Sequence, residues 1–283
     1  MARGAASLPG TRRSFALALG GGGARALAQI AVIEALDEMG VRPAAIAGTS
    51  MGAAIGAAYA AGMTGRAIRR HVIALAHNRG ETLARLAGAR IGKLADLWPA
   101  ALGNPLLVDG ERFAAAILPA ELPESFAALE IPLTVVATDL HGRGEAAFSD
   151  GPLRQALAAS MAVPGLVRPV RIGERICVDG GAVNPLPFDH LHGRADVLVA
   201  VDSSAGPLDA GVIPNPFECV FATITTIGHT LMADRLAQRA PDLVIRPNIG
   251  IFRLLDVFQA SAILRAAEPV KAEVKEKLGA LLA

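Results

Sequence analysis

The stretch Gly48-Thr49-Ser50-Met51-Gly52 decides the fold, because an apolar run enters it and a run of small residues leaves it. Ala44–Ala47 has the composition of a short buried strand, and Ala53–Ala61 that of a closely packed helix. A serine between two such elements is expected on a strained elbow, with its hydroxyl exposed above the sheet edge near a helix N-terminus. Gly48 and Gly52 leave room for the tight reversal and for close packing of the helix on the strand. G-x-S-x-G alone also describes a Gly/Ser turn into a buried helix, so the flanking elements carry the interpretation.

Composition allows one large domain, or a domain with an appendage, in a chain of 283 residues with 52% hydrophobic content. The net charge of +1 and an aromatic content of 4% argue against a nucleic-acid-binding protein. Cys177 and Cys219 are far apart and lack the spacing of metal ligands, so we expect no metal site and no cofactor.

Two segments resemble targeting or membrane signals. Ile46–Met63 carries no charge, but it is rich in glycine and alanine, which indicates a buried helix rather than a membrane span. Thr11–Leu17 resembles a twin-arginine export signal, yet it leads directly into a glycine loop that cleavage would damage. We therefore expect a mainly cytoplasmic protein, peripheral to a membrane at most.

Strands alternate with helices along the chain, which predicts an α/β fold: three α/β/α layers with a mostly parallel central sheet and a helical C-terminal part. The predicted domains are a mobile tail over 1–13, a catalytic core over 14–205 and a mainly helical extension, packed on the core, over 206–283. The expected strands are Phe15–Leu19, Ala44–Ala47, Leu133–Thr138, Glu145–Ser149, Val197–Val201 and Leu243–Ile245, with a hairpin in Val167–Val178. The expected helices include Ala24–Met39, Met51–Ala61, Pro152–Ala159, Phe217–Arg239 and Phe258–Leu282.

Residues of catalytic type follow several of these strands, and ligands of a parallel sheet gather at the C-terminal ends of its strands. Ser50, Asp139 and Asp202 each follow a predicted strand, and Asp179 follows the extended stretch Ile176-Cys177-Val178. This convergence predicts where the chemistry lies, but it does not decide which aspartate acts with Ser50.

The loop Gly20-Gly21-Gly22-Gly23-Ala24-Arg25 joins a strand to a helix, where free N–H groups could hold a pyrophosphate or an oxyanion. A dinucleotide site needs an acidic residue at the end of the next strand, but the chain has no Asp or Glu from Met39 to Gly80. Ser50 stands there instead. A serine facing N–H donors is the arrangement of acyl transfer, so we expect an oxyanion hole.

Together these residues resemble the patatin-like phospholipase family, whose motifs occur here in the family's order between Phe15 and Asp202. Beside the glycine loop and the elbow, the chain has Ala159-Ser160-Met161-Ala162-Val163-Pro164, Asp179-Gly180-Gly181 with Asn184 and Pro187, and the hairpin after Thr138-Asp139-Leu140. The helical tail after Pro216 resembles the short bacterial members.

The resemblance implies that Ser50 is the nucleophile and that Asp179 is its sole catalytic partner. It also implies an oxyanion hole from the N–H groups of Gly21, Gly22 and Gly23, with Arg25 supporting the loop. Gly180, Gly181 and Asn184 would then support the aspartate, Asn184 through bonds from its side chain to the backbone.

Three positions depart from the family pattern. Ala26 replaces a glycine, Val167 a commonly aromatic residue and Met161 a small one. We expect Val167 to widen the acyl pocket, so these departures concern substrate preference. Asp139 and Asp202 are read as turn residues.

Asp179 must act as a base, and a free aspartate, with a pKa near ~3.9, is too acidic to do so efficiently at neutral pH. Burial without a paired cation would raise its pKa, and close approach of Arg25 would lower it. We therefore expect Asp179 in an apolar wall poor in cations, with Arg25 turned toward the loop backbone.

The alternative is a Ser–His–Asp triad in the chain order of α/β-hydrolases, with His190, His192 or His229 as the base. His190 and His192 lie in a polar turn and His229 in a predicted helix, so each also has a structural interpretation.

A basic segment with Arg66, Arg69 and Arg70 follows the elbow helix and alternates with apolar residues. It is expected either to cover the acyl pocket and meet anionic lipid or to form a plain solvated helix face. The sequence thus predicts a serine acyl hydrolase of lipid esters, with an acyl ester as its partner. The alternative is a lipid-binding or regulatory protein of the same fold with negligible turnover.

Overall fold

The computed structural model describes residues 13–88, 108–204, 216–253 and 255–283. Within these residues eight strands form one sheet, in the order β5-β6-β3-β2-β1-β7-β8, with β4 paired to β3. The strands are β1 (Phe15–Leu19), β2 (Ala45–Thr49), β3 (Leu133–Asp139), β4 (Gly144–Phe148), β5 (Val170–Ile172), β6 (Arg175–Asp179), β7 (Val197–Val201) and β8 (Leu243–Ile245).

The sheet is parallel in its centre and antiparallel at one side. β1 pairs in parallel with β2 and β7, β2 with β3, and β7 with β8. β3 pairs antiparallel with β4 and β6, and β5 with β6. The predicted α/β sheet is therefore present, and the predicted hairpin forms its antiparallel edge.

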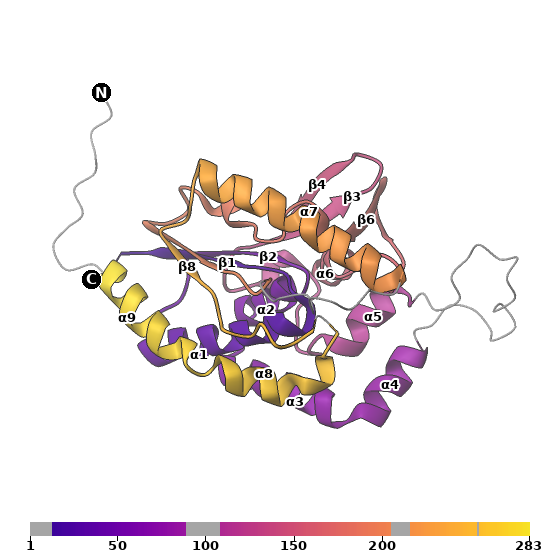
Figure 1. Ribbon diagram of the computed structural model, residues 1–283, viewed down its shortest axis with the longest axis horizontal. Coiled ribbons are helices and arrows are strands. Elements are labelled where there is room, and N and C mark those ends of the chain that lie inside the picture. The colour runs from indigo at the N-terminus through magenta and orange to yellow at the C-terminus, as the bar shows by residue number, and fades with distance from the viewer. Residues whose placement is uncertain (1–12, 89–107, 205–215, 254) are drawn as a thin grey trace, which may run out of the picture.

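Helices cover both faces of the sheet (Figure 1). One face carries α7 (Pro216–Gln238), while α1 (Gln29–Met39), α2 (Met51–Ala60), α3 (Gly65–His77), α8 (Ala260–Ala267) and α9 (Val270–Leu282) lie on the other. The other helices are α4 (Arg79–Gly88), α5 (Gly110–Ile117) and α6 (Leu153–Ser160), with short 3₁₀ turns η1 (Gly23–Ala28), η3 (Phe126–Ala128), η4 (Gly180–Ala182), η5 (Phe188–Leu191) and η6 (Val257–Gln259).

The two faces differ in the size of their side chains, because alternate residues of a strand point to opposite faces. In β1, Phe15, Leu17 and Leu19 join the large core on the face of α1 and α2. Ala16 and Ala18 face the other way and pack against residues of η5 and α7. Small side chains on that face let the covering elements approach closely.

The C-terminal part is built into the sheet rather than laid beside it. β8 pairs in parallel with β7, and α9 packs on α1 (Figure 1). The single helix predicted over Phe258–Leu282 is divided into η6, α8 and α9. Pro269, which lacks an N–H for helix pairing, precedes α9. The predicted domain boundary at 205/206 lies outside the described residues and stays a prediction. The predicted tail over 1–13 also stays a prediction, because residues 1–12 lie outside the described residues.

Gly40 ends α1 with a left-handed φ of 64°, as the sequence predicts. The helix predicted over Ala24–Met39 begins instead as the 3₁₀ turn η1, so α1 itself starts at Gln29. In the parts of the chain that the structure describes, every helix is too short or too polar to cross a bilayer.

Candidate active site

Ser50 occupies the turn between β2 and α2, with φ 55° and ψ −128°. Its left-handed φ is a costly conformation for a residue with a side chain, and it turns the hydroxyl out of the strand. The neighbouring glycines allow this turn. A Cβ on Gly48 would lie 2.6 Å from Ala53 Cα, and one on Gly52 would lie 2.4 Å from the carbonyl oxygen of Gly20. Neither position can hold a side chain without displacing backbone.

Ser160, at the end of α6, holds the backbone of the elbow. Its hydroxyl accepts a hydrogen bond from Ser50 N at 2.8 Å and donates one to Val136 O at 2.6 Å. The sequence motif contains this serine but predicts no role for it. The available signal is a single hydroxyl at the end of the apolar run 156–160. A buried hydroxyl in such a run needs hydrogen-bond partners, which indicates a structural role.

Asp179 faces Ser50 across β3. Thr49 pairs with Val136 of β3, and Ala137 pairs with Asp179, so the register places the two side chains at neighbouring levels of the sheet. Ser50 Oγ donates a hydrogen bond to Asp179 Oδ2 at 2.5 Å. The other carboxylate oxygen, Oδ1, accepts from Gly181 N at 2.8 Å. The sequence predicts that parallel strands bring Asp179 and Ser50 together at their shared C-terminal edge. Asp179 instead ends the antiparallel strand β6, and the register of β6 on β3 positions it.

The pKa of Asp179 is raised to about 6. Burial raises it, and the hydrogen bonds from Ser50 and Gly181 oppose that effect only in part. None of the ion pairs among the described residues involves Asp179. The surroundings therefore have the cation-poor character that the sequence suggests for this carboxyl group.

Arg25 lines the same pocket and is buried, at 8% exposure, with a guanidinium Nε that has no hydrogen-bond partner. Burial lowers the pKa of Arg25, and the negative charge of Asp202 opposes this effect. The carboxylate whose charge acts on Arg25 is thus Asp202 rather than Asp179. The sequence predicts that Arg25 turns toward the loop backbone, and its Nε makes no hydrogen bond there.

The glycine loop offers fewer free donors than expected. Gly21 N donates to Pro185 O at 2.8 Å, so the chain itself uses the donor that the sequence assigns to an oxyanion. No hydrogen bond is recorded from the N–H groups of Gly22 or Gly23 to any described residue. Both glycines have positive φ, 153° and 56°, and both line the pocket. Met51 is the first residue of α2 and follows Ser50 directly, so its N–H is a further backbone donor at the site. The sequence did not predict this donor.

The pocket around these groups has a volume of about 80 Å³. Residues of α7 form part of the pocket wall. The sequence did not predict this. A Cβ on Gly228 of α7 would lie 2.4 Å from Gly181 O, so this helix rests directly on the turn after Asp179. The lining residues are Gly21, Gly22, Gly23, Arg25, Ser50, Val163, Pro164, Asp179, Gly181, Pro185, Ser204, Ile224, Thr225 and His229. Met161 and Val167 are buried elsewhere and do not line it.

Asn184 supports the aspartate turn, but through its backbone. Asn184 N donates to Gly180 O at 2.9 Å, and Asn184 O accepts from Thr49 Oγ1 at 2.7 Å. The side-chain amide donates instead to Glu145 and Asp189, at 3.0 and 2.8 Å. The expected side-chain-to-backbone bonds are therefore wrong. Gly180 is required because a Cβ there would lie 2.3 Å from Val136 O.

The three candidate histidines differ in their surroundings. His190 is hydrogen-bonded to Glu145, and His192 stacks edge-on against the ring of Phe188. His229 lines the pocket, but no described hydrogen bond joins it to Ser50 or Asp179. A triad through His190 or His192 is therefore not formed here.

Glu145, Asp189 and His190 bring three possible metal-ligand atoms within 4.8 Å of one another. Arg235 pairs with both carboxylates, and the Asn184 amide donates to them as well. Protein donors thus already neutralise this cluster. Asp139 and Asp202 are turn residues: Asp139 accepts from the N–H groups of His141 and Gly142, and Asp202 from that of Ser204.

The basic helix α3 corrects one expectation. Arg69 does not face solvent as a free charge, because it forms a bidentate pair with Glu34 at 2.7 and 2.6 Å and also contacts Glu268 at 2.5 Å. Arg66 and Arg70 are exposed.

Known proteins resemble this chain in sequence. Residues 17–192 match the family described as patatin-like phospholipase. An uncharacterized NTE family protein of Mycobacterium bovis is 38% identical over 196 residues, which are 68% of this chain and 50% of that protein. Lysophospholipase nte1 of Aspergillus niger is 31% identical over 195 residues, or 67% of this chain and 12% of that protein. The chain therefore spans half the length, or less, of these relatives.

The fold also has a solved counterpart. VipD from Legionella pneumophila aligns with 94% of this chain and 67% of its own, with a TM-score of 0.50 and 15% sequence identity. The matched segment, 17–192, holds the glycine loop, the elbow and the aspartate turn. By this match over more than half of its length, the chain belongs to the patatin-like phospholipase family.

Proposed function

We propose that this protein is a serine acyl hydrolase of lipid carboxylic esters that uses Ser50 and Asp179 as a catalytic pair. One observation carries the proposal: the 2.5 Å hydrogen bond from Ser50 Oγ to Asp179 Oδ2, in a pocket that raises the pKa of the carboxyl group to about 6. A base of that pKa is deprotonated at neutral pH and is still basic enough to accept a proton from an attacking hydroxyl.

In the first half of the reaction, Ser50 Oγ attacks the carbonyl carbon of the ester while its proton passes to Asp179 Oδ2. The carbonyl oxygen becomes an oxyanion, and the free N–H groups of Gly22 and Gly23, with Met51 N, are its proposed donors. When the carbon–oxygen bond to the leaving alcohol breaks, Asp179 returns the proton to that alcohol. Water then repeats the sequence on the acyl-enzyme, releasing a carboxylic acid and restoring Ser50.

The lipid nature of the ester is supported by the relatives. The Aspergillus niger relative is named a lysophospholipase, and the family is named for phospholipases. The chain spans only part of the relatives it matches, so head group and regulation do not carry over with the catalytic segment.

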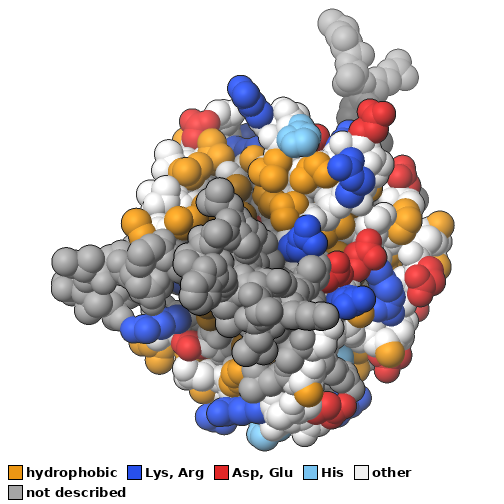
Figure 2. Space-filling view, turned by 90° about the vertical axis from the view of Figure 1, so that its right-hand side faces the viewer, with side chains coloured by type: hydrophobic (Ala, Val, Ile, Leu, Met, Phe, Trp, Pro, Cys, Tyr) orange, Lys and Arg blue, Asp and Glu red, His pale blue; other side chains and the backbone are white. Residues whose placement is uncertain are grey.

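Contact with an anionic membrane is a further part of the proposal, now through Arg66 and Arg70 without Arg69. α3 packs against η6, and apolar side chains near η6 are exposed: Ile251 to 86% and Leu255 to 52%. Arginines beside exposed apolar groups suit a lipid–water boundary. Apart from this contact, Figure 2 shows a group of hydrophobic side chains in the upper part of the face at the right of Figure 1, flanked by Lys and Arg side chains. The cytoplasmic location stays a prediction.

The membrane contact is tested by sedimentation with phosphatidylcholine vesicles that contain or lack phosphatidylserine. Arg66→Glu with Arg70→Glu should abolish the gain from phosphatidylserine. Equal binding of the wild type to both vesicle types would contradict a charged contact.

The catalytic proposal is tested by labelling with a fluorophosphonate, which reacts with activated serines. We expect stoichiometric labelling of the wild type and none of Ser50→Ala. Ser204→Ala is the matched control, because Ser204 lines the same pocket but its hydroxyl is bonded to Asp202. Labelling that persists in Ser50→Ala would overturn the proposal. No labelling at all would favour the lipid-binding or regulatory alternative.

The role of Asp179 is tested against the triad by Ala at His190, His192 and His229 together. We expect ester hydrolysis within about tenfold of the wild type, since no described hydrogen bond joins any of these rings to Ser50. A loss of about 10⁴-fold would identify a histidine base.

A further inference from the structure

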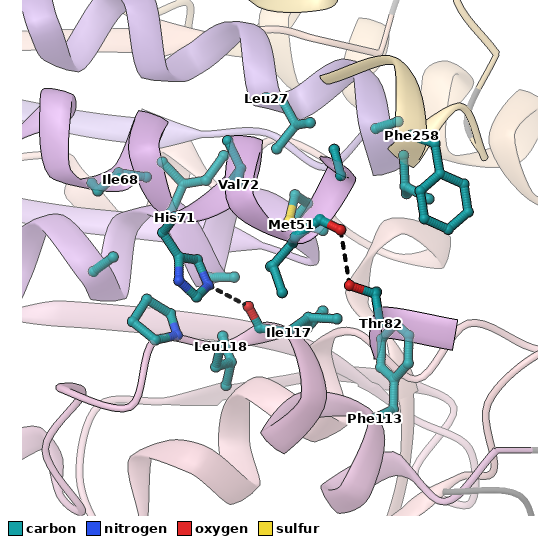
Figure 3. A pocket seen from close by; sticks show the side chains of 18 residues that line it. Leu27, Met51, Ile68, His71, Val72, Thr82, Phe113, Ile117, Leu118 and Phe258 are labelled. Atoms are coloured by element: carbon teal, nitrogen blue, oxygen red, sulfur yellow. Dashed lines mark hydrogen bonds between the residues drawn. The ribbon is translucent and has the colours of Figure 1, made fainter. Parts of the chain in front are cut away.

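A second cavity, of about 150 Å³, lies between α2, α3 and α5 and is almost entirely apolar. Figure 3 shows Leu27, Ile68, Val72, Phe113, Ile117 and Phe258 around it. None of the described residues that line it is Asp, Glu, Lys or Arg. The catalytic proposal makes no use of this cavity.

The two polar side chains that the close-up labels already have partners within the wall. His71 Nε2 and Ile117 O lie 2.8 Å apart, and Thr82 Oγ1 donates to Leu75 O at 2.8 Å (Figure 3). A buried polar group without a partner would call for a polar ligand, but these two make no such demand. The wall therefore suits a ligand without hydrogen-bonding groups, such as a hydrocarbon chain.

The cavity and the pocket of Ser50 share one wall. Gly23 and Arg25 line the pocket, whereas Ala24, between them, lines the cavity. In the same way Ser50 lines the pocket and Met51, the next residue, lines the cavity. The segments Gly23–Arg25 and Ser50–Met51 therefore form part of the boundary between the two spaces. The Met51 side chain is flexible enough to move aside, because it is unbranched.

We propose that this cavity binds the acyl chain of the ester, an inference that rests on the proposed function. An engineered apolar cavity of about 150 Å³ binds benzene, so this one has room for about six carbons. In the proposed complex the carbonyl carbon and its neighbour lie outside the cavity, at Ser50, which adds two carbons to the chain. The cavity is thus an acyl subsite matched to saturated chains of about eight carbons, and Met51 separates it from the site.

The first test is a series of p-nitrophenyl esters from acetate to dodecanoate. Each methylene that enters the cavity should raise kcat/KM about fourfold, and the gain should stop near octanoate. Val72→Trp fills the cavity from α3 and should remove most of the octanoate advantage while leaving acetate turnover within about twofold. Ala74→Trp is the matched control, an exposed position on the same helix that does not line the cavity. An unchanged chain-length profile in folded Val72→Trp would overturn the inference.

A second variant covers the case in which tryptophan disturbs folding. Ile117→Ala enlarges the cavity and should move the preferred ester to a chain about two carbons longer. An unmoved preference in this variant would also overturn the inference.

Binding without turnover separates this inference from the catalytic one. Ser50→Ala should bind octanoate in calorimetry, and the double variant with Val72→Trp should bind it at least tenfold more weakly. Equal binding by the two proteins would overturn the acyl subsite. The two proposals can also fail separately. If Val72→Trp abolishes octanoate binding but the wild type never reacts with a fluorophosphonate, the subsite is supported and the hydrolase is overturned.

Discussion

Glu34 and Asp179 are two carboxylates held inside the same molecule, and their surroundings shift their pKa values in opposite directions. Burial acts to raise the pKa of Glu34, but hydrogen bonds and charges from Arg69 and Lys271 outweigh it and lower that pKa. Arg69 approaches Glu34 to 2.6 Å, and Lys271 does so as well. Asp179 has only a hydroxyl and a backbone N–H as donors, so burial prevails and its pKa is raised.

The difference shows how the surroundings give one carboxylate a structural role and suit the other to act as a base. Glu34 joins α1 to α3 and, through Lys271, to α9, and its lowered pKa keeps it charged in that junction. Asp179 is kept away from cations, which costs stability but leaves a carboxylate that can accept a proton. The predictions below disturb one side of this contrast at a time.

The largest effect is expected from Asp179→Asn, which removes the proposed base. Ester hydrolysis should fall by about 10⁴-fold, because no other described group is hydrogen-bonded to Ser50 Oγ. In the wild type kcat/KM should rise with pH through about 6, as Asp179 loses its proton. A pH–rate profile measured from pH 4 to 9 checks this limb, and a flat profile down to pH 4 would contradict the raised pKa.

The same variant should gain stability where it loses activity. The wild-type carboxyl has a higher pKa folded, about 6, than its ordinary 3.8, so charging it in the folded state costs stability. This cost is absent below pH 3.8, grows as pH rises to 6, and is then constant at no more than about 3 kcal/mol. Urea unfolding at pH 4 and pH 8 measures it: Asp179→Asn should be the more stable protein only at pH 8.

On the other side of the contrast, Arg69→Met should destabilise the fold by about 3 kcal/mol at pH 7. This is the low end for breaking a buried ion pair, because Lys271 still contacts Glu34. The stabilisation from Glu34 is present above its ordinary pKa of 4.5 and is lost as pH falls below it. The gap between wild type and variant, measured by urea unfolding, should therefore narrow at pH 3.5.

A matched double variant isolates the charge from the packing. Glu34→Gln with Arg69→Met removes both charges of the pair and should recover part of the lost stability. If the double variant is as unstable as Arg69→Met alone, the loss comes from packing, and the ion pair is not what joins α1 to α3.

Ser160→Ala should have a smaller effect on activity. This variant tests whether neutral hydrogen bonds keep the backbone of the Ser50 turn in place. The change leaves the Ser50 N–H and the Val136 carbonyl without the hydroxyl that they share. We expect a loss of about 2 kcal/mol in unfolding free energy, and a drop in kcat without a matching change in KM. Ala158→Ser is a control on the same helix, where a hydroxyl is added at a buried position. Unchanged kcat in Ser160→Ala would show that α2 alone holds the elbow.

Much of the fold was predictable because its signals are local. Phe15–Leu19, Val197–Val201 and Leu243–Ile245 were predicted as strands with the bounds they have, since each is a short apolar run between polar residues. The end of α1 at Gly40 was equally local. The hairpin of β5 and β6 was predictable, but the antiparallel pairing of β6 with β3 was not, because nothing in Ile176-Cys177-Val178 specifies β3 as its neighbour.

The site was predictable in its residues and less so in its contacts. The N–H of Gly21 is used by Pro185 O, and Arg69 is paired with Glu268, partners distant in sequence that no local pattern reveals. α7 gave no sign of lining the pocket, since its apolar residues do not mark one face: Val220 and Ile227 are exposed, whereas Ile224 lines the site. Contacts between remote segments depend on tertiary packing, and periodicity within one segment does not contain them.

The smallest expected effect comes from making the surroundings of Asp179 resemble those of Glu34. Ile224 of α7 lines the pocket, so Ile224→Lys brings a cation to a site that has none paired with the carboxylate. A nearby positive charge favours the charged form and should lower the pKa of Asp179, moving the acidic limb of kcat/KM from about 6 toward about 5. A base that is one pKa unit weaker should be slower at pH 7, by up to about tenfold, and should compare better with the wild type at pH 5.

Ile224→Met is the control for this change, because it keeps an apolar side chain of similar reach and should leave the limb near pH 6. If both variants shift the limb equally, the raised pKa depends on how α7 packs over the pocket and not on the exclusion of cations. If only the lysine shifts the limb, the presence or absence of a paired cation decides the role of each carboxylate. Asp179 then acts as a base because it has none, and Glu34 forms a structural ion pair because it has two.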